Sequence, residues 1–247
     1  MNPQPLPNLV NSAADLRAHE ELRAIAAAGA AELDWDASAQ EVIAWVARNF
    51  ATGAAAVACS MADAVLPALV ADQLPGVDVL FLDTGYHFPE TYATRDAVAE
   101  NLRVNVVDVL PVNTVAEQDS LLGKDLFARD PAQCCALRKV EPLGRSLKGY
   151  EIWFTGVRRD EAPTRTNTPL VSWDEKNGLV KINPLATWSY EDVIGYSDEN
   201  LLPTNPLLNQ GYPSIGCAPC TKKVAPGADP RSGRWAGTSK TECGLHV

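Results

Sequence analysis

The sequence has little positive charge for its length. Its 247 residues include 21 Lys and Arg against 31 Asp and Glu, which gives a formal net charge of −10. A broad surface for nucleic acid needs a basic stripe, so this balance argues against nucleic acid as a partner. It leaves room for a small anionic ligand, because a few clustered arginines override the overall field locally.

Long apolar runs are missing as well. None approaches the roughly 20 apolar residues that a membrane-spanning helix needs, so we expect no membrane partner. The first residues, MNPQPLPNLV, lack a basic segment followed by an apolar one, so we expect no signal peptide and a cytoplasmic location. In that reducing compartment, cysteines are better interpreted as metal ligands or reactive thiols than as disulfides.

No internal repeat is visible, and the length fits one large α/β domain or two small ones. Residues 1–12 are rich in Pro and Asn and are expected to be flexible. Residues 225–247 begin with a Gly-, Pro- and Ser-rich stretch and are expected to form a mobile tail, hereafter the tail. The folded domain is therefore expected over residues 13–224. The sequence leaves the oligomeric state open, a homo-oligomer included.

Short apolar runs alternate with helical patterns along this domain. Strands are expected at 54–59, 77–82, 104–109 and 152–155; helices are expected at 13–29, 38–50, 89–101 and 190–200, with another ending at Val70. Asp36 or Ser38 is the expected N-cap of the helix at 38–50, and Ser189 is that of the helix at 190–200. This alternation predicts an α/β fold with a mostly parallel sheet and flanking helices.

Polar clusters follow three of the predicted strands, at Ser60–Asp63, Asp83–His87 and Gly156–Arg159. Ligands of such sheets bind at the carboxyl ends of the strands, so these clusters mark the candidate site. Cationic residues gather in two groups, Arg158, Arg159 and Arg165 after the last of these strands, and Arg231 and Arg234 in the tail.

The cysteines are the most informative residues. Cys217 and Cys220 form a CxxC motif, and Cys134 and Cys135 form an unusual tandem pair. Together they supply the four thiolates of a [4Fe–4S] cluster, although a tetrahedral zinc site would use the same number. A third interpretation is that the tandem pair is simply buried in the core.

Two cysteines remain. Cys59 lies in an Ala- and Val-rich strand and is interpreted as a small buried hydrophobe. Cys243 lies in the tail near Lys240 and His246, where cationic neighbours favour a nucleophilic thiolate; the alternative is an incidental tail thiol.

The ordered set of motifs resembles the assimilatory adenylylsulfate reductases of the phosphoadenylylsulfate reductase family. The matching segments span residues 55–247 and are CCALRK from Cys134, CAPC from Cys217, ECGLH from Glu242, LDTGYHFPET from Leu82, GVRRD from Gly156 and RSGRW from Arg231.

The resemblance implies an adenine-nucleotide α-hydrolase-like fold and a [4Fe–4S] cluster, with Cys243 as the nucleophile. It places the cluster on Cys134, Cys135, Cys217 and Cys220. It assigns the substrate to Ser60, Asp63, Thr84, Gly85, Lys139, Arg158, Arg159, Arg231 and Arg234.

One segment departs from the family pattern. Many relatives carry SxGAED after the first strand, whereas this chain has Ser60-Met61-Ala62-Asp63, which is shorter and lacks the glycine. Asp63 takes the place of the usual acid, and the contacts that this turn makes with the nucleotide stay open.

The resemblance implies reduction of adenosine 5′-phosphosulfate to sulfite in sulfate assimilation and cysteine biosynthesis. Cys243 attacks the sulfur, expels AMP and becomes an S-sulfocysteine. Because the other cysteines are assigned elsewhere, the second thiol has to come from a dithiol protein such as thioredoxin. The cluster is expected to join two segments and shape the field near Lys139 rather than carry electrons.

Three alternatives stay open from the sequence. The substrate could carry a 3′-phosphate. An ATP-pyrophosphatase of the same superfamily is disfavoured because the turn at Ser60 lacks the glycines of an SGGxDS loop. A zinc-stabilised binding module explains the four cysteines but neither Cys243 nor the arginine groups.

Overall fold

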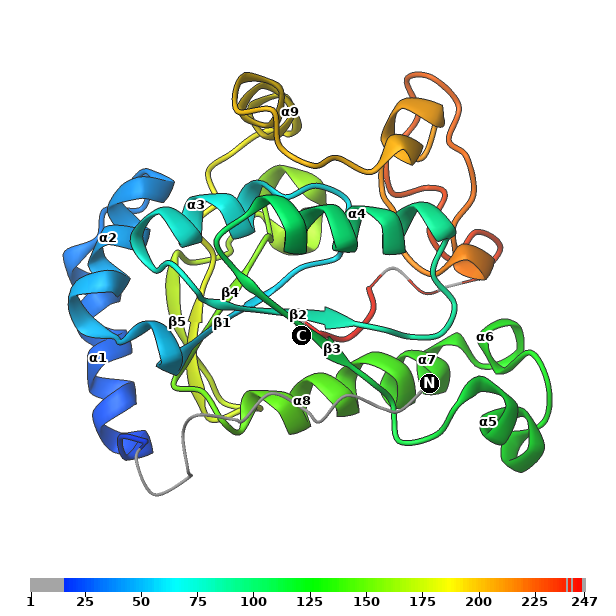
Figure 1. Cartoon of the computed structure of the whole chain (residues 1–247), viewed down its shortest axis with the longest axis horizontal. Helices are drawn as coiled ribbons and strands as arrows, with labels where there is room; N and C mark the ends of the chain where they lie inside the picture. The colour runs from blue at the N-terminus through cyan, green and yellow to red at the C-terminus, as the bar shows by residue number, and fades with distance from the viewer. Residues whose placement is uncertain (1–15, 239, 241, 246–247) are drawn as a thin grey trace.

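The computed structural model describes residues 16–238, 240 and 242–245 (Figure 1). The flexible segment predicted for residues 1–12 lies outside the described residues. In chain order the elements are α1 (His19–Glu32), α2 (Ala39–Asn49), η1 (Thr52–Ala54), β1 (Ala55–Ala58), α3 (Val65–Gln73), β2 (Asp78–Leu82), α4 (Pro89–Asn101), β3 (Asn105–Val109), α5 (Val115–Leu122), α6 (Leu126–Arg129), α7 (Pro131–Cys135), η2 (Ala136–Val140), α8 (Glu141–Leu147), β4 (Ile152–Thr155), η3 (Arg159–Glu161), η4 (Pro163–Arg165), β5 (Val171–Asp174), β6 (Leu179–Ile182), α9 (Tyr190–Glu199), η5 (Pro206–Gln210) and η6 (Ala218–Cys220).

The described strands form one six-stranded sheet in the order β3-β2-β1-β4-β6-β5. Every neighbouring pair is parallel except β5 with β6. The chain moves outward from β1 to β3 and then returns to place β4 on the other side of β1. The order therefore reverses between β1 and β4, which is where an open α/β sheet offers a ligand crevice. The predicted mostly parallel α/β fold is confirmed.

Helices cover both faces of this sheet. Helices α3 and α4 lie on one face and α8 lies on the other (Figure 1). Residues of α1 and α2 pack into the same apolar core as α3. Because helices cover both faces of the parallel strands, the sequences of these strands are continuous apolar runs rather than alternating apolar and polar residues.

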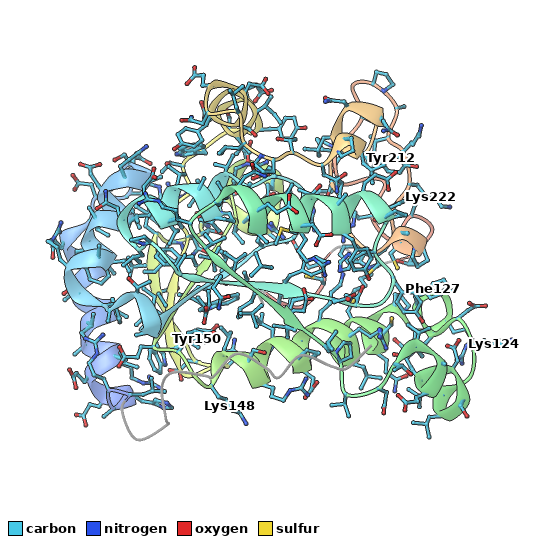
Figure 2. The ribbon with its side chains drawn as sticks, viewed as in Figure 1. Lys124, Phe127, Lys148, Tyr150, Tyr212 and Lys222 are labelled. Atoms are coloured by element: carbon cyan, nitrogen blue, oxygen red, sulfur yellow. The ribbon has the colours of Figure 1, made fainter. Side chains whose placement is uncertain are left out.

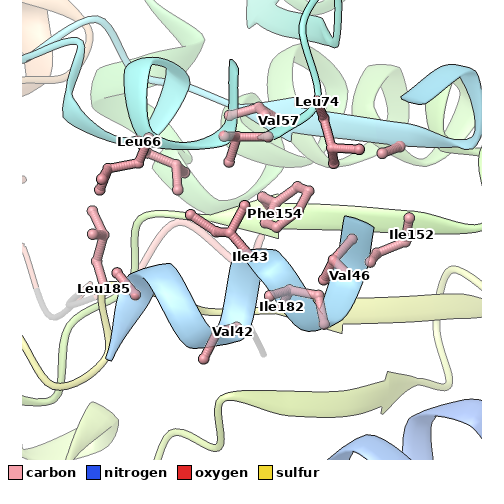
Figure 3. Packing of buried hydrophobic residues seen from close by; sticks show 14 of the residues in the cluster. Val42, Ile43, Val46, Val57, Leu66, Leu74, Ile152, Phe154, Ile182 and Leu185 are labelled. Atoms are coloured by element: carbon pink, nitrogen blue, oxygen red, sulfur yellow. The ribbon is translucent and has the colours of Figure 1, made fainter. Parts of the chain in front are cut away.

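The strands divide their side chains between two cores. Val57, Phe154 and Ile182 join the larger core, where Ile43 and Val46 of α2 point toward the sheet (Figure 3). Intervening residues of the same strands, among them Trp153, join a smaller core beneath α8. This alternation follows from the two-residue period of a strand.

Local signals fix several helix starts. Ser38, one of the two N-caps expected for α2, accepts a hydrogen bond from the backbone of Glu41, whose carboxylate bonds back to Ser38. Ser189 begins α9 with the same reciprocal arrangement toward Asp192. Each such box satisfies backbone donors that would otherwise lack a partner, and each confirms a predicted N-cap.

The β5–β6 hairpin was not expected from the sequence. Its turn contains Asn177 and Gly178, and Gly178 has a φ of 72°. An Asn-Gly pair is a recognised hairpin signal, so the information was present in the sequence. The hairpin lengthens the sheet beyond β4 and gives α1 a surface to contact.

No helix within the described ranges is long and apolar enough to cross a membrane.

We predict that one buried ion pair contributes measurably to stability. Glu151 is almost fully buried and accepts from Arg17 Nε and Nη2 at 3.0 and 2.6 Å. Glu151→Gln should lower the free energy of unfolding in urea by about 1–3 kcal/mol, because buried donors lose a charged partner. Glu175→Gln is the matched control, since Glu175 pairs with Arg23 through both oxygens in solvent. It should lose less, and equal losses would contradict the prediction.

The same comparison predicts a pH dependence. Burial acts to raise the pKa of Glu151, but the bonds from Arg17 lower it overall. The contribution is therefore present above the unfolded pKa of about 4.3 and is lost as the pH falls through the lowered folded pKa. The stability difference between the wild type and Glu151→Gln should shrink below about pH 4. A difference that stayed constant down to pH 2 would contradict the assignment.

Candidate active site

A cavity of about 740 Å³ opens at the carboxyl ends of β1 and β4, the point where the strand order reverses. Its walls come from the segment after β1, the end of β2, the segment after β4, helix α9 and the tail. This size suits a nucleotide-sized ligand, and the location is the one expected for this kind of sheet.

The turn after β1 is held by contacts from a distant segment. Met61 has a φ of 57°, a conformation that glycine adopts more readily than a bulky residue. Its backbone N–H donates to Cys59 Sγ at 3.4 Å, and its carbonyl accepts from Asn205 Nδ2 at 3.2 Å. The backbone N–H of Asn205 donates to Ala62 O at 3.0 Å. These bonds stabilise the turn at Met61, which lacks the glycine expected from the family pattern.

Ser60 and Asp63, both predicted to border the nucleotide, line the cavity. Asp63 Oδ1 accepts from the backbone of Val65 at 3.0 Å, which anchors it at the start of α3. Burial raises the pKa of Asp63, with Arg158 acting in the opposite direction and Glu161 adding to the rise. The carboxyl group is therefore easier to protonate than a solvated one and is suited to hydrogen bonding a neutral ligand group.

Thr84 and Gly85, which were also predicted to border the nucleotide, are not among the cavity-lining residues. Thr84 is fully buried, and its hydroxyl lies 3.3 Å from Cys217 Sγ. Gly85 has a φ of 72°, and a Cβ there would meet Val115 and Arg138 at 3.0 and 3.2 Å. This turn thus connects the end of β2 to the cysteines, and its contact with the nucleotide stays a prediction.

His87, the last residue of the polar cluster after β2, lines the cavity and contacts the rings of Phe81 and Tyr92. Its Nε2 donates to Leu82 O at 2.8 Å, which leaves Nδ1 as the acceptor. That atom is buried and has no hydrogen-bond partner among the described residues. Burial lowers the pKa of His87, so the ring is neutral and offers an acceptor toward the ligand.

The predicted cluster cysteines surround one small pocket. Cys134, Cys135, Cys217 and Cys220 line it together with Lys139 and Trp235. Phe127 of α6 and Lys222, next to η6, mark two of the segments that meet at this end of the molecule (Figure 2). The four sulfurs therefore come together although more than 80 residues separate the two pairs.

The local backbone explains how adjacent cysteines both reach this pocket. Asp130 accepts from Gln133 N at 2.8 Å and begins α7, which ends at Cys135. The chain continues directly into the π-helical turn η2 before α8 begins. A π turn is wider than an α turn and is frequently found at functional sites. Arg138 within it is buried and donates to Thr84 O and to Gln118 Oε1, at 3.1 Å for the latter, which fixes the turn against β2.

The electrostatics of the pocket reflect four thiols in close proximity. Burial raises the pKa of Cys134 to about 12, and the neighbouring Cys135, Cys217 and Cys220 add to the rise. Thiolates at this density need a compensating cation, and a metal group supplies one by displacing the protons.

Lys139 lines both the small cysteine pocket and the large cavity. Burial acts to lower its pKa, but Cys217, Cys135 and Cys243 more than offset this, and the pKa is raised overall. Its ammonium group is therefore charged and available to both sites.

The predicted arginines differ in what they contact. Arg158 donates to Asp160 at 3.1 Å, and Arg159 stacks on Trp35 at 3.7 Å while donating to Asp36. Both line the cavity, as do Arg231 and Arg234. Arg159 is itself largely shielded, whereas its partner Asp36 is largely exposed.

Arg234 is the most enclosed of these cations. Its Nη1 donates to Ser214 Oγ and Ile215 O at 3.3 and 3.1 Å, while its buried Nε has no partner among the described residues. Burial lowers its pKa, as does Arg231 nearby. It packs against Gly216, where a Cβ would lie only 2.2 Å from Arg234 Nη2. A buried cation with a free donor is suited to an anion.

Cys243 lines the same cavity as the turn after β1, the arginines and Lys139. Arg165, which the sequence grouped with Arg158 and Arg159 but did not assign to the substrate, lines the cavity as well and binds both Glu161 and Glu242. Its proximity to Arg158 and Arg159 in the chain was the one available signal.

Comparison with solved structures supports the fold. The chain superposes on the phosphoadenylyl-sulfate reductase from Candida auris with a TM-score of 0.64 at 28% identity, covering 85% of this chain and 98% of that one. It superposes on the FMN adenylyltransferase from Candida glabrata with a TM-score of 0.54 at 12% identity, covering 86% and 78% of the two chains. The second likeness concerns the fold alone.

Curated relatives are much closer in sequence. The adenosine 5′-phosphosulfate reductase of Mycolicibacterium smegmatis is 64% identical over 227 residues, covering 92% of this chain and 95% of the relative. The proteins of the same name from Rhodococcus erythropolis and Mycobacterium tuberculosis are 61% and 56% identical at similar coverage. The family model for the phosphoadenosine phosphosulfate reductase domain matches residues 54–223. The chain therefore belongs to the phosphoadenosine phosphosulfate reductase family.

Proposed function

We propose that this chain reduces adenosine 5′-phosphosulfate to sulfite and AMP, with Cys243 as the nucleophile. The observation that carries the proposal is the position of Cys243, which shares one cavity with Ser60, Asp63 and a group of buried cations. The names and high identities of the curated relatives support the same reaction.

The cavity offers different chemistry at its two ends. Asp63 and neutral His87 provide acceptors suited to the hydroxyl and amino groups of a nucleoside. Lys139 and Arg234 form no ion pair with a carboxylate among the described residues, so they are available to the phosphosulfate oxygens. Cations fixed in a partly closed site stabilise negative charge that would otherwise repel an attacking thiolate. Arg158 and Arg159 would add to this field from the segment after β4.

The first step forms a bond between Cys243 Sγ and the sulfate sulfur. The bond from that sulfur to the bridging oxygen breaks, and AMP leaves with its electron pair. An S-sulfocysteine remains on the chain. Placing the two reacting atoms together in the cavity contributes to the rate, since well-oriented intramolecular reactions gain up to about 7–11 kcal/mol.

The second step needs two electrons from outside the site. A thiolate of a dithiol protein of the thioredoxin kind attacks Cys243 Sγ, and sulfite leaves with the electron pair of the sulfur–sulfur bond. The partner's second thiol then resolves the mixed disulfide and restores Cys243. The six cysteines of the chain are all free, which suits the reducing conditions of the cytoplasm, where we place the reaction.

The four pocket cysteines fit an iron–sulfur cluster better than a single ion. Within the described ranges, no group of three or more His, Cys, Asp or Glu side chains is arranged to hold one metal ion. A cluster has a separate iron for each thiolate and so suits sulfurs that surround a pocket. We propose that Cys134, Cys135, Cys217 and Cys220 hold a [4Fe–4S] cluster, which when bound would supply a fixed charge beside Lys139 and join α7 to η6.

We predict that Cys243→Ser abolishes sulfite formation while AMP binding stays within about twofold of the wild type, because only the nucleophile is lost. The assay supplies adenosine 5′-phosphosulfate or its 3′-phosphorylated analogue with thioredoxin, and mass spectrometry detects an SO3 adduct on Cys243 when thioredoxin is omitted. Ser232→Ala, an exposed change in the same tail, is the control and should be fully active. Sulfite formation by the serine variant would overturn the assignment, and faster reduction of the analogue would overturn the substrate.

We predict that the anaerobically purified protein contains about four irons and four sulfides per chain. Cys134→Ser and Cys217→Ser should each lose most of that iron and the visible absorption, because one ligand of the set is gone. Cys59→Ala is the control, since Cys59 lies outside the small pocket. Stoichiometric zinc without iron would contradict the cluster.

A further inference from the structure

Residues 242–245, the described end of the tail around the nucleophile, contact other parts of the protein at three places. The Glu242 carboxylate binds arginines beside the cavity, Lys176 Nζ donates to Gly244 O at 3.0 Å, and Leu245 packs against the smaller core. Cys243 lies between the first two contacts. The mobility of the tail stays a prediction, but these contacts define a docked arrangement of residues 242–245.

The Glu242 contact is the strongest of the three. Its two oxygens accept from Arg165 Nε and Nη2 at 3.0 and 2.8 Å, a bidentate arrangement. One oxygen also accepts from Arg231 Nη2 at 3.1 Å, and the other accepts from Thr164 Oγ1 at 3.3 Å. Charge-assisted bidentate bonds are about twice as strong as neutral ones and fix the orientation of both groups.

This cluster is shielded from solvent. The side chains of Arg165, Glu242 and Arg231 are only 11%, 15% and 17% exposed. Salt therefore screens the pairs less than it screens surface pairs. Burial acts to raise the pKa of Glu242, but Arg165 and Arg231 lower it overall, so the carboxylate stays ionised at neutral pH.

Glu242 immediately precedes the nucleophile in the chain. Neighbouring Cα atoms are about 3.8 Å apart, so fixing one side chain restricts where the next can point. Arg165 comes from η4, which follows β4, whereas Arg231 comes from the tail itself. The carboxylate thus joins the tail to the segment after β4, on the wall of the cavity that Cys243 lines.

We propose that Glu242 is a positioning residue that holds the Cys243 thiol in the cavity for its attack on substrate, and that breaking its pairs with Arg165 and Arg231 frees the thiol for the dithiol partner. This rests on the proposed function for its catalytic consequence. It also changes the role expected for Arg231, which holds the tail in this arrangement and leaves the anion to Lys139 and Arg234.

The first test reads the position of the thiol without any turnover. Cys243 of substrate-free wild type, Glu242→Gln and Glu242→Asp is alkylated with iodoacetamide over pH 6–10, and the rate is mapped by mass spectrometry. Glu242→Gln should raise the plateau rate at high pH several-fold, because an undocked tail exposes the thiol. Glu242→Asp, which keeps the charge on a shorter side chain, should be intermediate. A change in midpoint alone would mean that Glu242 acts only on the thiol's acidity and would overturn the proposal.

The second test follows the chemistry in a single turnover without thioredoxin. Formation of the SO3 adduct should slow on the order of 10²-fold in Glu242→Gln, because a displacement of about 1 Å at a reacting group has that effect. AMP affinity should stay within about twofold of the wild type, because the nucleotide end is untouched. Glu32→Gln is the matched control, since Glu32 also pairs with an arginine, Arg48, but lies away from the cavity.

The outcomes separate the two proposals. If the wild type forms no adduct, the proposed function fails, while the alkylation rates still report on docking. If Glu242→Gln matches the wild type and Glu32→Gln in both assays, the positioning role is overturned. Thr164→Val, which removes one weaker bond to the same carboxylate, should give a smaller increase in alkylation and covers the case in which Glu242→Gln does not fold.

Discussion

Buried positive charge is the constraint on which this structure depends. In a protein whose net charge is −10, Lys139 and Arg234 are enclosed beside the sheet with no carboxylate paired to them among the described residues. Withdrawing an ion from water without a partner is unfavourable, so these cations favour another source of negative charge beside them. The proposed cluster on one side and the proposed anionic substrate on the other would provide it. The two cations therefore favour the binding of negatively charged groups beside them.

The backbone brings these groups together by joining remote segments through a few contacts. Arg138 binds the turn after β2, Thr84 contacts Cys217, and the backbone of Trp235 donates to Cys220 O at 3.0 Å. Each bond links one segment that carries a cysteine to another part of the site. Lys139 follows Arg138 in the same π-helical turn, so the residue that secures the turn and the residue that faces the cavity are placed by one distortion of the helix.

Much of this was visible in the sequence, because apolar runs and capping residues are local signals. The strands from β1 to β4 and the N-caps Ser38 and Ser189 followed from them. The four cysteines were marked instead by their motifs and by the family resemblance, and their role as cluster ligands stays a prediction. The β5–β6 hairpin was missed because its strands are short and its Asn-Gly turn was not weighed. The placement of Thr84 against Cys217 and of Arg165 on Glu242 rests on contacts between residues more than 70 positions apart, which no local pattern encodes. The hydrogen bond from Asn205 to Met61 O is another contact between residues far apart in the sequence.

Gly216 limits which substitutions the protein can accept at this position during evolution. Its missing side chain leaves the space that Arg234 occupies, and the next residue is Cys217. A single added carbon would displace the Arg234 guanidinium. Because Gly216 adjoins Cys217, a substitution that moves Arg234 acts directly beside a proposed cluster ligand, so selection on the proposed anion site also acts next to the proposed cluster site.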